Sequence, residues 1–220
     1  MLRGEIAVAK AEKKQKHVLT DRPASQRKIA EILAAARVEF FANGFSAATI
    51  EAIAARAQVS KVTIYSWFKD KENLFAQVVR TESSQLRENF LLENLAEQNL
   101  HEILLHAARG MLDFLMREDR VRMERILGAE VTRDPAIGKM FLENGPLRMA
   151  EGLKALLQAS VEKGEIQSDD LEASAEMFAG LVMGRMDLLL RYGHKIKMTA
   201  ADKEKRARRA VDAWMLIHQV

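Results

Sequence analysis

The sequence from Thr49 to Phe68 reads TIEAIAARAQVSKVTIYSWF and decides how the N-terminal third folds. Thr49 can cap a short helix that turns Ile53 inward, because its side-chain oxygen can accept from free backbone N–H groups. The helical pattern breaks at residues 57–59, after which Ser60 can cap another helix that ends near Phe68. The stretch therefore predicts two short helices joined by a three-residue turn.

A helix, a tight turn and a second helix are typical of DNA-binding proteins, in which the second helix enters the major groove. Lys61 can donate to guanine or to a phosphate, Val62 can touch a thymine methyl, and Thr63 can contact either a base or a phosphate. Lys71, in the first turn of the next helix, is expected to face the DNA backbone. An ordinary helical corner would produce the same local pattern, so the motif by itself leaves both interpretations open.

Composition predicts an all-α protein. The 220 residues are 48% hydrophobic and 30% charged, and they include only three prolines and no cysteine. Apolar residues recur near every 3.6 positions and nowhere alternate, so no sheet is expected. Without cysteine there is no disulfide framework or thiolate metal site, and without an apolar run of about 18 residues we expect no contact with a membrane. No signal-peptide core is recognisable, so the expected location is the cytoplasm.

Charge and periodicity divide the chain into three parts: a basic arm (1–24), a helix-turn-helix domain (25–75) and a larger helical body (76–220). Residues 1–75 carry 13 Lys and Arg against 8 Asp and Glu, whereas the remainder is mildly acidic. The basic excess favours an anionic partner such as nucleic acid, although the arm could also be a solvated tail. Helices of the body are expected at about 100–117, 119–132, 136–163 with a break at Gly145-Pro146, 169–192 and 200–218.

The segment 25–75 closely resembles the DNA-binding domain of TetR/AcrR-family transcriptional regulators. The residues that carry this resemblance are Ala35-Ala36, Phe40-Phe41, Asn43-Gly44-Phe45, Thr49-Ile50, Ile53-Ala54, Val59-Ser60-Lys61, Ile64-Tyr65, Phe68 and Lys69–Leu74. The resemblance implies a three-helix head on a helical body, and a homodimer that binds palindromic, double-stranded operator DNA, usually as a repressor. It also implies release of the operator when a small molecule occupies the body. The body itself resembles the family only in architecture.

The motif and the resemblance together indicate a set of DNA contacts. The expected residues are Thr49, Lys61, Val62, Thr63, Tyr65, Trp67 and Lys71. The resemblance implies a phosphate contact for Tyr65, whereas Trp67 could pack on the sugar–phosphate backbone or bury its ring against the first helix. Gln58 stands at the turn position usually filled by glycine, and would be strained by about 1 kcal/mol if its φ were positive.

Methionine is concentrated in the body, where ten of the eleven methionines follow residue 110. Methionine fills irregular gaps and lines adaptable sites, so a pocket for an apolar or aromatic effector is one interpretation, and ordinary core packing is the other. The candidate ligand-binding residues are Met111, Phe114, Met123, Met140, Phe141, Met177 and Phe178.

Two apolar helices at the C-terminus are candidates for a dimer interface. Gly180 and Gly184 are four residues apart and would permit close helix approach, while Val211, Trp214 and His218 follow a helical spacing. Burial of these residues within one chain is the alternative.

The sequence offers little for catalysis. His101 and His106 are five residues apart, which does not suit a metal site on one helix face, and no glycine-rich phosphate loop follows a strand. We therefore expect no metal, no cofactor and no enzymatic activity. Two other functions remain as alternatives to a ligand-controlled regulator: an architectural DNA-binding protein without ligand control, and a helical enzyme or carrier for a small molecule.

Overall fold

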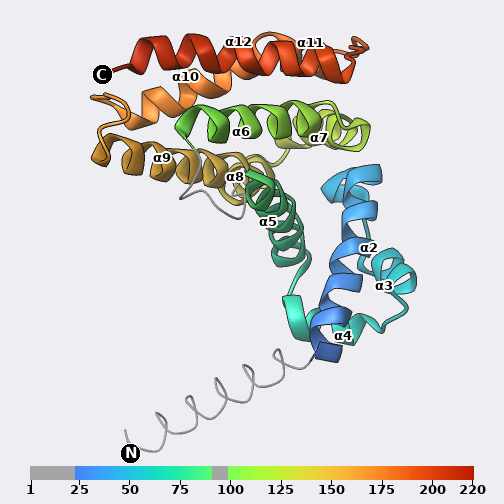
Figure 1. Cartoon of the computed structure of the whole chain (residues 1–220). Helices are drawn as coiled ribbons and strands as arrows, with labels where there is room; N and C mark the ends of the chain where they lie inside the picture. The colour runs from blue at the N-terminus through green and yellow to red at the C-terminus, as the bar shows by residue number, and fades with distance from the viewer. Residues whose placement is uncertain (1–22, 91–98) are drawn as a thin grey trace, which may run out of the picture. The chain divides into compact units, whose positions relative to one another are not determined.

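The computed structural model describes residues 23–90 and 99–220, and every regular element in these ranges is an α-helix (Figure 1). This confirms the all-α class. The helices are α2 (Pro23–Ala47), α3 (Ile50–Ala57), α4 (Lys61–Phe68), α5 (Lys71–Phe90), α6 (Leu100–Leu115), α7 (Glu118–Val131), α8 (Pro135–Asn144), α9 (Pro146–Glu162), α10 (Leu171–Met183), α11 (Met186–Arg191) and α12 (Ala200–His218).

The chain forms two compact units. The described part of the first unit comprises residues 23–39 and 48–78, and the second comprises Phe40–Ala47 and Val79–Val220. Helices α2 and α5 therefore each begin in the first unit and end in the second. This division does not coincide with the boundary drawn from the sequence after residue 75, because residues 40–47 pack with the body. The expected basic arm lies outside the described residues as far as residue 22.

Local capping signals start the helices of the first unit. The Thr49 hydroxyl accepts from the backbone N–H three residues further on at 3.2 Å, and the Ser60 hydroxyl accepts from the corresponding N–H at 3.1 Å. The Asp70 carboxylate caps α5 in the same way at 2.7 Å. These bonds satisfy backbone donors that have no partner inside a helix, which is why short polar residues favour these positions.

Four buried side chains form the centre of the first unit: Ile32 of α2, Ile53 of α3, Ile64 of α4 and Leu74 of α5. Helices α3 and α4 have only eight residues each and cannot bury enough apolar surface alone, so they depend on α2 and α5 for stability. The turn between α3 and α4 passes through Gln58, whose φ of 53° and ψ of 45° are left-handed. The expected strain at this position is therefore present.

Helix α2 is interrupted at Gly44. Gly44 has a φ of 83°, and an added Cβ would lie 2.3 Å from Cγ2 of Ile126 in α7. The next two backbone N–H groups, of Phe45 and Ser46, donate to the Glu130 carboxylate of α7 at 3.1 Å and 2.7 Å. The end of α2 is thus held on α7 within the second unit.

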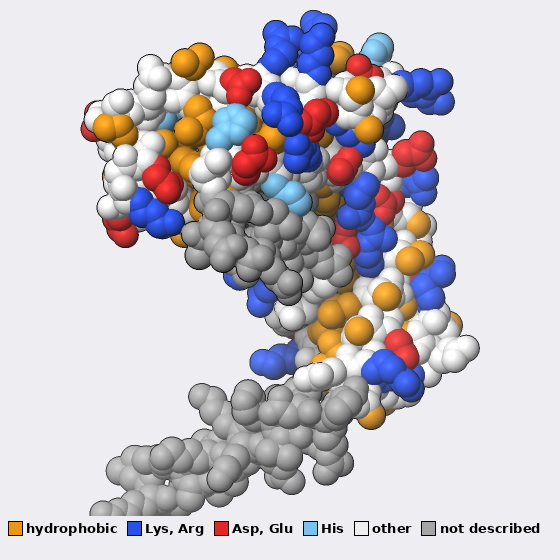
Figure 2. All heavy atoms as spheres, in the orientation of Figure 1, with side chains coloured by type: hydrophobic (Ala, Val, Ile, Leu, Met, Phe, Trp, Pro, Cys, Tyr) orange, Lys and Arg blue, Asp and Glu red, His pale blue; other side chains and the backbone are white. Residues whose placement is uncertain are grey.

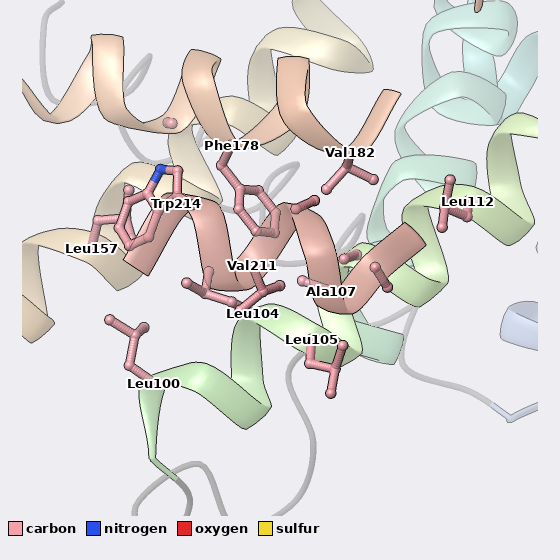
Figure 3. Close-up of a cluster of buried hydrophobic side chains, with 14 of the residues drawn as sticks. Leu100, Leu104, Leu105, Ala107, Leu112, Leu157, Phe178, Val182, Val211 and Trp214 are labelled. Atoms are coloured by element: carbon pink, nitrogen blue, oxygen red, sulfur yellow. The ribbon is translucent and has the colours of Figure 1, made fainter. Parts of the chain in front are cut away.

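The core of the second unit lies between α6, α10 and α12, around Trp214 (Figure 3). The Trp214 indole N–H donates to the carbonyl of Ser174 at 2.9 Å, and its ring meets the edge of Phe178 at a centroid distance of 6.3 Å. The His218 ring stacks on Trp214 at 3.8 Å and lies 2.8 Å from the Ser174 hydroxyl. An aromatic side chain with a polar group needs such a partner when it is buried.

This core corrects part of the expected dimer interface. Val211, Trp214 and His218 are buried inside a single chain, so the alternative of intramolecular burial applies to them. Their helical spacing shows only that one face of α12 is buried. It does not say whether the covering surface comes from the same chain or from a second one.

The expected single helix over 169–192 is also wrong. It is two helices, α10 and α11, separated at Gly184, which has a φ of 48°. An added Cβ at Gly184 would lie 2.6 Å from a terminal nitrogen of Arg206, whose guanidinium donates to the last carbonyls of α10 at 2.7 Å and 2.9 Å. Gly184 therefore serves the end of α10 and does not continue a helix face with Gly180.

Polar side-chain pairs cover the contact between α6 and α12. Arg109 pairs with Glu204 at 2.5 Å, and His101 lies 2.8 Å from Asp212. In Figure 2 basic and acidic side chains are accordingly interspersed over the visible surface of the second unit. Exposed pairs of this kind contribute little to stability, so the apolar core carries most of it.

Candidate nucleic-acid interface and ligand cavity

Helix α4 has one buried and one exposed face. Ile64 and Phe68 are buried, whereas Val62 is 76% exposed and Tyr65 is 47% exposed. A solvent-exposed valine on a short helix contributes nothing to the core of its own unit. Such a residue suits contact with the apolar edge of a base in the major groove.

Lys61 begins α4 on its exposed side and is held by a carboxylate from α3. Its ammonium lies 2.7 Å from the Glu51 carboxylate. The hydrogen bond to Lys61 lowers the pKa of the Glu51 carboxyl, and the same bond raises the pKa of Lys61. The pair is therefore charged at neutral pH, and a DNA phosphate or guanine would compete with Glu51 for the ammonium.

The remaining predicted contacts lie in the same unit with different exposure. The Thr63 hydroxyl lies 2.9 Å from the Ser60 hydroxyl, and the exposed Thr49 is engaged as the cap of α3. Trp67 and Lys71 are each half-buried. Five of the seven predicted residues therefore lie on α4, whereas Thr49 caps α3 and Lys71 begins α5. Thr49, Lys61, Val62 and Tyr65 are exposed.

Sequence reasoning missed Glu51 as a neighbour of the recognition helix. Glu51 and Lys61 are ten residues apart on different helices, so the pattern within one helix cannot reveal the pair. The turn at Gln58 brings the starts of α3 and α4 together. The only sequence signal for this pair is that Glu51 and Lys61 carry opposite charges and each lies in the first turn of its helix.

The second unit contains a cavity of about 1020 Å³. Five of the seven predicted ligand-binding residues line it: Met111, Phe114, Met123, Phe141 and Phe178. Met140 and Met177 do not, and Met177 is instead exposed on α10. The volume is close to the upper end of the range of small-molecule sites in proteins.

Charged residues also line this cavity, and the sequence did not indicate them. Arg120 is buried and its guanidinium lies 2.6 Å from the Glu124 carboxylate; the buried Glu82 carboxylate lies 2.8 Å from Arg117. Burial raises the pKa of the Glu124 carboxyl, while the neighbouring Arg120 opposes that shift. Arginine and glutamate in a helix are usually exposed, so only the packing identifies these as internal groups.

Two family models match this chain. Residues 32–78 match the bacterial regulatory proteins of the tetR family, and residues 102–218 match the C-terminal domain of AefR-like transcriptional repressors. The chain belongs to the TetR family of transcriptional regulators. The second match covers the body, for which the residues had suggested only a similar architecture.

Individual relatives agree with this assignment. The transcriptional repressor AcnR of Corynebacterium glutamicum is 27% identical over 149 residues, which cover 68% of this chain and 73% of AcnR. A solved structure of a TetR-family regulator from Mesorhizobium loti has a TM-score of 0.75 and 28% identity, and it covers 90% of this chain and 100% of that one. The structure of the flavonoid-responsive regulator FrrA has a TM-score of 0.70 and 30% identity, covering 88% and 98%.

Membership of the family makes this chain a DNA-binding transcriptional regulator with a helix-turn-helix head. Members of this family are regulators and not enzymes. Within residues 23–90 and 99–220, no group of three or more His, Asp and Glu side chains is arranged to hold a metal ion. None of the helices in these ranges is long and apolar enough to cross a membrane.

Proposed function

We propose that this TetR-family regulator is a cytoplasmic homodimer that represses transcription by binding a palindromic operator, and that a small apolar or aromatic effector releases it. The capped helix α4, with Val62 exposed beside Lys61, carries the DNA-binding part of the proposal. The cavity in the second unit supports the effector-binding part.

Each exposed residue of α4 has a role in this proposal. Lys61 leaves Glu51 to bind a guanine or a phosphate, Val62 packs on a thymine methyl, and Thr63 positions the helix on the DNA backbone. Tyr65 donates its hydroxyl to a phosphate. Lys71 supplies a further charge at the start of α5. Thr49 and Trp67 complete the surface at its two sides.

The dimer face is assigned to the exposed sides of α10 and α12. Apolar side chains that a monomer would leave in water lie on both helices: Met177 and Leu181 on α10, and Leu216 (66% exposed) and Ile217 (60% exposed) on α12. Gly180 has no atom within 4 Å of an added Cβ, so the proposed close approach of a partner helix remains available there. A two-fold interface through these helices buries the four large side chains.

Two helices that begin in the first unit contribute to the cavity wall, and they provide a route for effector control. Helix α2 contributes Phe41, and α5 contributes Val79 and Ser83. An effector that prefers one placement of these helices changes the spacing of the two recognition helices, whose half-sites lie about 34–36 Å apart in such dimers. Operator DNA must then weaken effector binding by the same factor.

Similarity to FrrA supports an aromatic effector. That protein is a flavonoid-responsive regulator by name, and it shares 30% of its residues with this chain over most of both lengths. The phenylalanine and methionine side chains of the cavity suit a ligand of the same general character.

Selection of bound DNA from a random pool tests the proposal. A palindromic consensus and a dimeric mass by light scattering are expected. The double variant Lys61→Ala and Lys71→Ala should lose at least about tenfold in operator affinity, whereas Lys195→Ala, an exposed lysine of the second unit, should not. Unchanged affinity in the double variant would remove the assigned interface. DNA binding without sequence preference or effector response would favour an architectural protein.

A further inference from the structure

Glu51 is the only acidic residue between Thr49 and Phe68, the stretch that forms the helix-turn-helix. Its side chain is 64% exposed in the first turn of α3, beside Lys61, which is 53% exposed at the start of α4. DNA carries a negative charge at every phosphate, so a carboxylate on the surface that meets it weakens binding unless it finds a partner there. A surface ion pair contributes little to stability, so the fold alone does not account for this carboxylate.

The spacing of the two charged groups matches the spacing of two atoms in one base pair. The Lys61 ammonium donates to the Glu51 carboxylate at 2.7 Å, so a donor and an acceptor are presented side by side. In a G·C pair the guanine O6 accepts and the cytosine N4 donates in the major groove, and these two atoms are joined by a hydrogen bond of about 2.9 Å. The ammonium and the carboxylate can therefore reach both atoms of one base pair, each exchanging its present partner for a base.

A guanine suits Lys61 better than a phosphate does, because of what happens to Glu51. If Lys61 bound a phosphate, the Glu51 carboxylate would lose its partner beside a row of negative charges. Glu51 does not avoid this cost by taking up a proton at neutral pH, since the hydrogen bond from Lys61 lowers the pKa of its carboxyl. If Lys61 binds guanine, Glu51 lies next to the N4 amino group of cytosine, which is the donor that carboxylates read in the major groove.

The order of donors and acceptors also distinguishes G·C from T·A. A T·A pair likewise places an acceptor, O4 of thymine, next to a donor, N6 of adenine. The two pairs differ on the outer side, where guanine adds the acceptor N7 and thymine carries its methyl group. Lys61 has three N–H donors and can give a second one to N7, whereas the methyl group accepts none. G·C is therefore the pair that both side chains fit.

From this match we propose that Glu51 is a specificity-determining residue, which accepts a hydrogen bond from N4 of a cytosine while Lys61 donates to the guanine of the same base pair. The inference rests on the proposed function in taking α4 as the helix that enters the major groove and Lys61 as a base contact. It adds a residue of α3 to the surface that reads the operator, and it names the base pair at one position of each half-site.

Selection of bound DNA from a pool of random duplexes, with the full chain and with Glu51→Ala, tests the assignment. The wild type should select a consensus with G·C at one position of each half-site, and the variant should select no base there while keeping the other preferences. On the wild-type consensus duplex, Glu51→Ala should lose at least about tenfold in affinity, as expected for a lost base contact in each half-site. A variant that still selects G·C at every such position would overturn the proposal.

The sign of the change in affinity separates reading of a base from simple competition. If Glu51 only competed with DNA for Lys61, its removal would raise the affinity for every sequence, because a negative charge leaves the surface. Glu72→Ala, which removes an exposed carboxylate from the first turn of α5, is the matched control and should keep both the consensus and the affinity of the wild type, or bind slightly more tightly. Unchanged or higher affinity of Glu51→Ala for the consensus duplex would contradict the proposal.

A consensus duplex with N4-methylcytosine at the assigned position tests the donor itself. The methyl group takes the place of the N–H in the major groove, while the other N–H still pairs with guanine. The wild type should lose about tenfold in affinity on this methylation, whereas Glu51→Ala should bind the two duplexes nearly equally. Equal losses in the two proteins would remove Glu51 as the acceptor.

Thermal melts verify that each variant is folded, and Glu51→Gln provides a second removal of the charge if the alanine variant does not fold. The glutamine amide donates as well as accepts, so this variant should also admit adenine at the assigned position. The two proposals fail separately. A wild-type consensus together with an unchanged selection by Glu51→Ala leaves operator binding intact and removes the role of Glu51. A wild type that selects no consensus removes the operator-binding proposal and, with it, this one.

Discussion

The turn between α3 and α4 and the core around Trp214 are built by different means. The turn uses neighbours in sequence: Thr49 and Ser60 each cap a helix within three residues, and Gln58 adopts a left-handed conformation. The core joins helices that are far apart in the sequence, as in the bond from Trp214 to Ser174, which are 40 positions apart. Local signals therefore specify the two helices and the turn of the helix-turn-helix, whereas long-range packing specifies the body and its cavity.

Among the substitutions that test this comparison, Trp214→Ala in the core of the body should cause the largest loss of stability. Removing a fully buried indole leaves a void and removes its hydrogen bond to the Ser174 carbonyl, so the free energy of unfolding should fall by about 3–5 kcal/mol. Urea denaturation measures this loss. Arg209→Ala, an exposed change on the same helix, should remain within about 0.5 kcal/mol of the wild type. A Trp214→Ala loss as small as the control's would mean that α12 is not held by this core.

Gly44→Ala tests whether the end of α2 depends on its contact with α7. A Cβ there combines a positive φ with a 2.3 Å approach to Ile126, so the expected loss is about 2–4 kcal/mol. Gly164 also has a positive φ, of 72°, but no atom lies within 4 Å of an added Cβ. Gly164→Ala should therefore cost only the backbone strain of about 1–2 kcal/mol. Equal losses in the two variants would contradict the tight contact between α2 and α7.

Gln58→Gly should stabilise the first unit, because glycine adopts a φ of 53° without strain. After subtraction of the extra freedom of glycine in the unfolded chain, the expected gain is up to about 1 kcal/mol. Ala55→Gly, an exposed position inside α3, should change stability in the opposite direction by about the same amount. Thermal melts compare the two. A loss at Gln58→Gly would show that its side chain, and not its backbone, determines the turn.

The smallest effect concerns the ion pair of Arg109 and Glu204 on the surface of the body. The hydrogen bond from Arg109 lowers the pKa of Glu204 to about 2, from an ordinary value of 4.5. A lowered folded-state pKa means that this contribution is complete above the ordinary value and is lost as the pH falls through about 2. The urea midpoints of wild type and Glu204→Gln should therefore converge between about pH 5 and pH 2, and also at about 1 M salt at neutral pH. A difference that persists under both conditions would show a role other than the ion pair.

The sequence predicted much of the first unit because its signals act over three or four residues. The caps at Thr49 and Ser60 lie where they were expected. The helix-turn-helix motif could be placed from these residues alone. Which of its exposed side chains contact DNA stays a prediction.

The body was predicted less completely, and the errors share a cause. A helical period shows that α12 has a buried face but not what covers it, so Val211, Trp214 and His218 were assigned to a partner chain and are buried in their own. The break at Gly184 depends on Arg206, which is 22 residues away and donates to the last carbonyls of α10. Neither the surface that covers α12 nor the contact of Arg206 with α10 can be predicted from neighbouring residues.

The sequence by itself therefore determined the all-α class, the ends of most helices and the helix-turn-helix pattern, because capping, backbone preference and helical period act between near neighbours. Tertiary structure alone decided that Arg120 is buried beside an aromatic cavity, and that Glu130 holds the backbone N–H groups at the end of α2. Burial and long-range hydrogen bonds depend on which helices meet. Which helices meet is decided by the packing of the whole unit and not by any single stretch of residues.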